Sequence, residues 1–286
     1  MRIANRQGRA ILVRDGDAAH LEAADIETAT AGRFSSDPAH AFERWDELAA
    51  WFTESGSAVA GWEPIEASHL GPPSPSPRQI FAIGVNYSAH ADETGIAVPE
   101  HPMVFTKFAS ALTGPETQVS LPTETVDWEI ELVVVIGRQG ANIPADAAWD
   151  HIAGLTVGQD ISERTLQMAG KFPQFSLAKS YPGFAPTGPV VVSLDEFDDL
   201  NAIPLRATVN GRVVQEGSTA QLIFGIPTLI ERISAVCTLY PGDLIFTGTP
   251  DGVGMGRTPP VYLKPGDELV SEVPGVGILR QTFEKN

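Results

Sequence analysis

From about residue 79 to the C-terminus, the chain consists mainly of short apolar runs separated by glycine and proline. Clear examples lie in residues 188–192, 205–211 and 242–246, where the strand-like parts are 190–192, 205–209 and 244–246. Apolar runs of this length between turn residues are typical of buried strands. Asn210-Gly211 follows the second run, and this dipeptide favours a type I′ hairpin because both residues tolerate a positive φ. The pattern predicts a mainly β region with short connections.

Three segments have helical spacing instead. In the first, residues 38–53, the apolar side chains lie about one helical turn apart. They are Phe42, Trp45, Leu48, Ala49 and Phe52. Two shorter helices are expected at about residues 162–169 and 227–238, where Pro227 suits the first helical position. The predicted fold class is therefore α+β, mainly β with short helices.

A proline-rich stretch divides the chain. Residues 71–77 read Gly-Pro-Pro-Ser-Pro-Ser-Pro, and proline at this density favours a stiff, extended connector. We predict a small N-terminal domain over residues 1–70, a linker over 71–78 and a larger domain over 79–286.

The composition limits the partners of the protein. The 286 residues are 43% hydrophobic, which is enough for a sizeable core. Acidic residues outnumber basic ones by 36 to 19, and the net charge is −17. Such a surface repels nucleic acid and anionic membranes, so neither is an expected partner. A small anionic substrate would need local positive charge from a metal ion or from particular lysines.

The single cysteine, Cys237, cannot form an intramolecular disulfide, which fits a reducing compartment. A buried, inert thiol is the favoured role for it. The first residues lead into no apolar segment of signal-peptide length, and the apolar runs are too short to span a bilayer. We therefore expect a cytoplasmic protein.

Acidic and apolar residues alternate over residues 127–132, immediately before the apolar run 133–136. In a strand, Glu129 and Glu131 would lie on one face, roughly 7 Å apart. Two acids that face a folded interior need a cation, and a hard divalent ion such as Mg²⁺ or Mn²⁺ prefers oxygen ligands. The alternative is a half-exposed strand with a solvated acidic face.

Three further positions carry candidate chemistry. His90 and Glu93 have helical spacing, so the carboxylate could orient the imidazole as a general base, unless the two form only a surface ion pair. Asp160 ends an apolar run and is either a third metal ligand or a helix N-cap. Lys179 is flanked by apolar residues and could supply the positive charge that an anionic substrate needs.

Residues 246–256 form a glycine-rich segment without the Gly-Lys-Ser/Thr ending of a phosphate loop. Its glycines are expected to make a tight turn or to let the backbone approach a ligand.

Five motifs follow one another over about residues 78–284. They are Ile-Gly-Val-Asn-Tyr at 83–87 with His90 and Glu93, Asp-Trp-Glu-Ile-Glu-Leu at 127–132, Gly-Gln-Asp at 158–160, Leu-Ala-Lys-Ser at 177–180, and Pro-Gly-Asp at 241–243 followed by Thr-Gly-Thr-Pro at 247–250. In order and spacing they resemble the fumarylacetoacetate hydrolase family. Leu-Lys-Pro-Gly-Asp at 263–267 also resembles that family's closing segment.

The resemblance implies that Glu129, Glu131 and Asp160 bind Mg²⁺ or Mn²⁺. It also implies that His90 and Glu93 form a water-activating dyad on a mobile lid.

The resemblance further implies that Lys179 contacts the substrate and takes part in catalysis, and that Gln167 and Thr249 bind the substrate. The implied fold is a β-sandwich-like roll, normally assembled as a homodimer. The expected partner is a small anionic keto acid.

The chain departs from the family pattern at three places. Residues 107–110 are Lys-Phe-Ala-Ser where many members have Lys-Pro-Ser-Ser, and residues 163–165 are Glu-Arg-Thr where many have Ala-Arg-Asp. Val85 stands where some acylpyruvate hydrolases have arginine. These departures leave the substrate open.

The leading hypothesis is metal-dependent hydrolysis of a carbon–carbon bond in a β-diketo acid of the acylpyruvate or fumarylacetoacetate type. His90 would deprotonate water, and a pyruvate-type enolate would leave with a carboxylic acid as the second product. The alternative is oxaloacetate decarboxylation or isomerisation of an unsaturated dicarboxylate, through an enolate at the same site. A third hypothesis is a keto-acid-binding protein without turnover.

Overall fold

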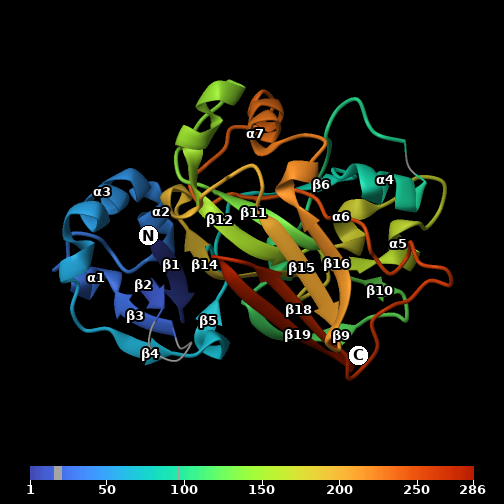
Figure 1. The fold of residues 1–286 in the computed structure, drawn as a ribbon, viewed down its shortest axis with the longest axis horizontal. Helices are drawn as coiled ribbons and strands as arrows, with labels where there is room; N and C mark the ends of the chain where they lie inside the picture. The colour runs from blue at the N-terminus through green and yellow to red at the C-terminus, as the bar shows by residue number, and fades with distance from the viewer. Residues whose placement is uncertain (16–20, 96) are drawn as a thin grey trace.

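The computed structural model describes residues 1–15, 21–95 and 97–286, and strands predominate in it (Figure 1). Within these residues the strands form a large sheet, a five-stranded sheet and a two-stranded pair. The helices between them are short. The predicted fold class, mainly β with short helices, is confirmed.

The large sheet runs through the middle of the molecule. In spatial order its strands are β4 (Glu63–Ile65), β3 (Leu21–Asp25), β2 (Arg9–Asp15), β1 (Arg2–Arg6), β14 (Ala185–Val192), β12 (Ile152–Gln159), β11 (Ile130–Ile136), β17 (Leu244–Phe246), β6 (Ile80–Gly84) and β7 (Met103–Thr106). Two further short strands, β5 (Leu70–Gly71) and β8 (Leu112–Thr113), pair with β1 and β14. Every residue of β11, β12 and β14 is buried, so these central strands have neighbours on both faces.

The five-stranded sheet packs against these central strands. Its order is β16 (Arg212–Ser218), β15 (Pro204–Val209), β18 (Glu268–Val273), β19 (Gly277–Lys285) and β9 (Glu116–Leu121). Burial alternates along β18 and β19, so one face of this sheet points inward and the other is more exposed. The inward face contacts β11, β12 and β14, which makes a two-layer β core. The two-stranded pair is β10 (Val126–Asp127) with β13 (Ser162–Glu163).

Short helices lie between and outside the sheets. The α-helices are α1 (Ile26–Ala29), α2 (Pro38–Glu43), α3 (Trp45–Ser55), α4 (Ser88–Thr94), α5 (Arg164–Gln167), α6 (Phe175–Ala178) and α7 (Ile226–Ser234). The 3-10 helices are η2 (Gly56–Ala58), η3 (Ala67–His69), η4 (Ala109–Ala111), η5 (Ala145–His151), η6 (Leu194–Glu196) and η7 (Thr219–Gln221).

The structure corrects the bounds of the three predicted helices. The segment 38–53 is two helices, because Arg44 leaves the helical conformation and the rings of Phe42 and Trp45 stack 5.8 Å apart across the break. The segment 162–169 begins as strand β13, and its helix starts only at Arg164, where the Glu163 carboxylate caps the helix. The third helix spans 226–234 and is therefore shorter than predicted.

The Asn210-Gly211 hairpin is confirmed. Strands β15 and β16 pair on either side of it, with Val209 opposite Arg212. Asn210 has φ +50° and Gly211 has φ +75°, as a type I′ turn requires.

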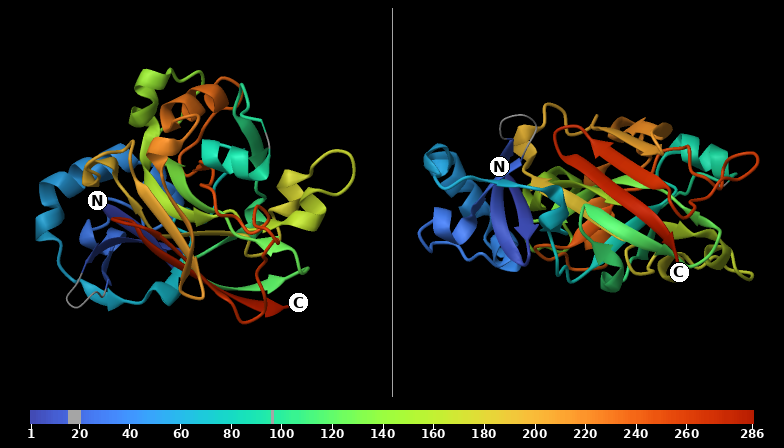
Figure 2. Two further views of the ribbon diagram at one scale, coloured as in Figure 1. Left: turned by 45° about the vertical axis from the view of Figure 1, so that its right-hand side comes forward. Right: turned by 90° about the horizontal axis from the view of Figure 1, so that it is seen from below.

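The N-terminal residues extend the large sheet. Strand β1 pairs antiparallel with β14, and the amino group of Met1 donates to Ser193 Oγ at 2.6 Å. Figure 2 shows the N-terminal strands and helices at one end of the molecule and the α5–α6 segment at the other. The division into domains at residues 71–78 stays a prediction. Within the described residues, no helix has the length and apolar character needed to cross a membrane.

Candidate metal centre

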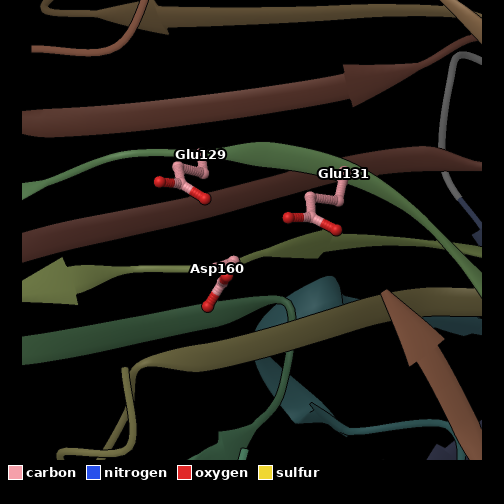
Figure 3. A group of neighbouring side chains, drawn as sticks. All are labelled: Glu129, Glu131 and Asp160. Carbon is pink, nitrogen blue, oxygen red and sulfur yellow. The ribbon is translucent and has the colours of Figure 1, made fainter. Parts of the chain in front are cut away.

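Glu129, Glu131 and Asp160 converge where strand β11 begins beside the end of strand β12 (Figure 3). One carboxylate oxygen from each residue lies within 4.8 Å of the other two. The register explains this meeting, because Glu131 pairs with Gly158 and Asp160 follows directly after β12. All three side chains are buried, so the alternative of a solvated acidic face is wrong.

The positions of Glu129 and Asp160 differ in detail from the predicted strand and from the predicted helix N-cap. Glu129 lies just before β11, because its N–H bonds the side-chain carbonyl of Gln159 and its C=O accepts from the N–H of Asp160. Asp160 is not a helix cap, since Glu163 caps α5 instead.

Three buried cations surround two of these carboxylates. Lys179 Nζ donates to Glu129 Oε2 at 2.7 Å and to Asp160 Oδ2 at 2.6 Å. Lys107 Nζ donates to Asp160 Oδ1 at 2.5 Å and to the backbone carbonyl of Lys179. Arg164 Nη2 lies 2.7 Å from Glu129 Oε1. Glu129 and Asp160 each have two cationic partners.

Glu131 is in a different electrostatic position. Its Oε2 accepts the N–H of Gly248 at 2.6 Å, and none of the described cationic side chains forms an ion pair with it. Burial, together with the charges of Asp160 and Glu129, raises the pKa of Glu131 well above its usual range. Burial also opposes ionisation of Glu129, but Lys179 and Arg164 outweigh it and lower the pKa of Glu129 to about 2. Glu131 is therefore the carboxylate that lacks a counter-charge.

This donor set fits a hard divalent cation. Buried carboxylate oxygens that converge on one point are the ligands that Mg²⁺ and Mn²⁺ prefer. An added ion would supply the positive charge that Glu131 lacks. The three residues thus satisfy the chemistry of the predicted metal site.

His90 and Glu93 lie together on α4. His90 Nδ1 is 3.3 Å from Glu93 Oε2, and His90 is buried, so the alternative of a surface pair is wrong. Both Glu93 oxygens accept the N–H of Gly252, each at 3.1 Å. At Gly256 an added Cβ would lie 2.4 Å from Glu93 Cγ, so a glycine allows the close approach of this loop. His90 is one of the groups that lower the pKa of Glu129, so the imidazole is within electrostatic range of the triad.

Gln167 and Thr249 are both buried beside this centre. Gln167 Oε1 accepts from Arg164 Nη1 at 2.8 Å. The Thr249 hydroxyl donates to the carbonyl of Ile130 and accepts from Gln215 Nε2, both at 2.8 Å. The Thr249 side chain therefore links the loop that follows β17 to the first residue of β11. Contact of either side chain with substrate stays a prediction.

The motifs do not predict Lys107, Arg164 or Asp127 as site residues, yet the structure brings all three to the centre. Asp127 Oδ2 accepts from Arg164 Nε at 2.9 Å, and its carboxylate also accepts the N–H groups of Gly254 and Met255. Lys107 and Arg164 each lie immediately beyond a strand, as Asp160 does. A cation directly after the mainly apolar strand β7 is the sequence feature by which Lys107 could be found, whereas Arg164 follows the polar pair Ser162-Glu163 and has no such signal.

Comparisons with known proteins identify the family of the chain. Residues 79–284 match the family model described as fumarylacetoacetate (FAA) hydrolase C-terminal. Over 216 residues, 75% of this chain and 68% of the relative, the chain is 44% identical to a mitochondrial oxaloacetate tautomerase of Homo sapiens.

Two solved structures extend the similarity to the whole chain. A Mycobacterium smegmatis protein provisionally named HpcE is 49% identical, with a TM-score of 0.91 over 100% of this chain and 99% of its own. Maleylpyruvate hydrolase from Sphingobium sp. SYK-6, solved with manganese(II) and pyruvate, is 29% identical, with a TM-score of 0.80 over 100% of both chains. The motifs, the fold and these similarities together show that the chain belongs to the fumarylacetoacetate hydrolase family.

Proposed function

We propose that this protein catalyses divalent-metal-dependent enolisation of a small 2-oxo dicarboxylate, and that oxaloacetate is its first candidate substrate. One observation carries the proposal: a buried carboxylate triad in which Glu131 lacks a cation while Lys179 lies beside the other two acids. The 44% identity to an oxaloacetate tautomerase supports enolate chemistry on this substrate. The support is therefore better for the alternative hypothesis than for carbon–carbon hydrolysis.

The charge balance of the centre suits an anionic substrate. Four carboxylates, those of the triad and Asp127, face the cationic groups of Lys107, Lys179 and Arg164. When bound, Mg²⁺ or Mn²⁺ would add Lewis-acid charge that stabilises an enolate oxygen. The ion would also change the net charge of these seven groups from −1 to +1, although the chain as a whole carries −17.

In the proposed proton transfer, His90 acts as the base, Glu93 orients it, and Lys179 stabilises the charge that develops on the substrate. Glu93 orients the imidazole of His90, which removes a proton from carbon 3 of the keto acid. The ammonium group of Lys179, held by Glu129 and Asp160, offsets the negative charge that grows on the 2-oxo oxygen. The protonated His90 then gives its proton, directly or through solvent, to that oxygen, which completes the enol and restores the neutral imidazole. The reverse sequence returns the keto form.

The test starts from each pure tautomer of oxaloacetate. We expect Mg²⁺ or Mn²⁺ to accelerate the approach to keto–enol equilibrium, followed by ¹H NMR, and a chelator to abolish the acceleration. A parallel coupled assay for pyruvate separates tautomerisation from decarboxylation. Equal rates with and without protein, at full metal occupancy, would contradict the proposal.

Hydrolysis of an acylpyruvate is the second candidate. The oriented His90–Glu93 pair favours it, because such a dyad could equally deprotonate water, and a maleylpyruvate hydrolase is a structural relative. Metal-dependent release of pyruvate and a free carboxylic acid from an acylpyruvate would establish this reaction. Tight retention of keto acids without any product would instead favour the binding-protein hypothesis.

We also propose a homodimer located in the cytoplasm. Met168, Phe172 and Leu177 are all more than half exposed near α5 and α6, and grouped apolar side chains of this kind often mark an interface. Sedimentation analysis tests the dimer.

The human relative is mitochondrial by name, so localisation needs direct imaging of the native protein.

A further inference from the structure

Tyr87 carries a buried hydroxyl that has no hydrogen-bond partner among the described residues. The side chain is 1% exposed and directly precedes α4, three positions before His90. Its backbone is fixed by a bridge to Leu222. Tyr87 belongs to the Ile-Gly-Val-Asn-Tyr motif, but it has no role in the proton transfer proposed for His90, Glu93 and Lys179. Unpaired buried hydroxyls are uncommon in native structures and call for an explanation.

The neighbouring residue holds Tyr87 close to the triad. Asn86 Nδ2 donates to the carbonyl of Thr247 at 2.7 Å, and Asn86 Oδ1 accepts the N–H of Phe224 at 2.8 Å. The side chain of Asn86 packs closely against Gly248, where an added Cβ would lie 2.7 Å from Asn86 Cβ. Gly248 in turn donates its N–H to Glu131. A short, rigid path therefore connects Tyr87 to the carboxylate that lacks a counter-charge.

The electrostatics agree with this placement. Burial, and in second place the negative charge of Glu131, raise the pKa of Tyr87 above its usual range. The phenol therefore stays protonated at neutral pH and can act only as a neutral donor or acceptor.

The cations of the centre differ from Tyr87 because they already have acceptors. Lys107, Lys179 and Arg164 each donate to carboxylates of the protein. The Tyr87 hydroxyl has no such acceptor, and a 2-oxo dicarboxylate brings several oxygen acceptors into the site. We infer that the Tyr87 hydroxyl donates a hydrogen bond to an oxygen of the 2-oxo acid bound at the triad. Tyr87 is then a further substrate-contacting residue. This inference rests on the proposed function.

The test compares Tyr87→Phe with the parent protein. Oxalate is the probe, because its planar pair of adjacent oxygens imitates the carboxylate and enolate oxygens of the substrate. Calorimetric titration should show oxalate binding to the Mn²⁺-loaded variant weakened roughly 10- to 100-fold, the range for a hydrogen bond to a charged group. Mn²⁺ affinity should be unchanged. The thermal midpoint of the metal-free variant should be equal or higher, because the variant loses only an unpaired hydroxyl.

Tyr240→Phe is the matched control. Tyr240 lies in a turn before β17, with its ring 4.5 Å from the guanidinium of Arg78, and we expect it to leave oxalate affinity unchanged. Unchanged oxalate affinity in folded Tyr87→Phe would overturn the inference. An equal loss of Mn²⁺ affinity would also overturn it, because Tyr87 would then act through Glu131. A lower thermal midpoint without any change in oxalate binding would show a purely structural role. A parent protein that binds Mn²⁺ and oxalate but does not convert oxaloacetate would contradict the proposed function and leave the Tyr87 comparison intact.

Discussion

The acidic triad and the His90–Glu93 pair are held in place in different ways. The triad lies at the ends of two central antiparallel strands that are fully buried and hydrogen-bonded along their length. The dyad lies on the short helix α4, and Glu93 is bound to the backbone of Gly252, which is 159 positions away in the chain. The candidate metal site is therefore part of the buried core, whereas the geometry of the His90–Glu93 pair depends on a loop that docks against it. Binding of the ion and movement of the proton should be separable by mutation.

The largest expected effect comes from the triad. Glu131→Gln removes the carboxylate that most needs a cation, so Mn²⁺ affinity should fall by two orders of magnitude or more, about the loss of a full charge-assisted ligand. Calorimetric titration measures this affinity. The exposed Glu284→Gln variant on β19 is the control and should bind like the parent. Parental affinity in Glu131→Gln would show that the triad is not a metal site.

The next effect concerns the dyad. His90→Ala should keep the parental Mn²⁺ affinity but lose roughly 10²- to 10⁴-fold in the rate of oxaloacetate enolisation, the usual contribution of a general base. Steady-state rates at saturating metal measure the change. His40→Ala, at an exposed position on α2, provides the matched histidine control. A normal rate in His90→Ala would remove the dyad from the mechanism.

A smaller effect should follow from the docking loop. In Gly256→Ala the added methyl group would meet Glu93 Cγ at 2.4 Å, so the Glu93 side chain has to shift and its contact with His90 is disturbed. We expect turnover to fall roughly 10- to 100-fold, because a catalytic group misplaced by about 1 Å can cost about 100-fold, with little change in Mn²⁺ affinity. At Gly225, by contrast, an added Cβ meets nothing closer than 4.0 Å, so Gly225→Ala is the control. If Gly256→Ala lowered metal affinity as strongly as turnover, the two regions would not be separable.

The smallest effect is on stability as a function of pH. The pKa of Glu131 is raised in the folded protein, so the metal-free fold binds this proton more tightly than the unfolded chain does. Stability from this group should fall as the pH rises above the ordinary glutamate value and should level off beyond the raised pKa. The lowered pKa of Glu129 acts in another window, where stability is lost as the pH falls from the ordinary value towards about 2.

Thermal melts in chelator across the pH range measure this dependence. Saturating Mn²⁺ should abolish the fall at higher pH, since the ion replaces the proton on Glu131, and Glu131→Gln should abolish it without any metal. A slope that persists in Glu131→Gln would assign it to another group.

The same contrast explains what could be predicted from the sequence. The triad is predictable because strand alternation places Glu129 and Glu131 together and a neighbouring strand end supplies Asp160. The dyad is predictable from helical spacing, but its burial is not, because it depends on the distant Gly252. Lys107 reaches Asp160 across 53 positions, and Asp127 binds Gly254 across 127, so only the tertiary fold reveals these roles.

The exact ends of the helices could not be predicted from apolar spacing, because they also depend on contacts that the spacing does not show. Apolar spacing continues through residues 38–53, and the break at Arg44 comes from the local backbone between two stacked rings. The short helix α5 starts where Glu163 caps it, after two residues that pair with β10. Periodicity indicates the buried face, while capping and strand pairing decide where each helix begins and ends.

The role of the triad can be tested by titrating the metal-free protein with Mn²⁺ while the rate of enol-oxaloacetate conversion is followed by stopped-flow absorbance. We expect the rate to rise in proportion to the occupancy of one site per chain and to return to the background rate in chelator. We also expect Glu131→Gln to stay at the background rate at the Mn²⁺ concentration that saturates the parent. A rate that is independent of Mn²⁺ in the parent, or parental conversion by Glu131→Gln at that concentration, would contradict the assignment of the triad as the centre of the chemistry.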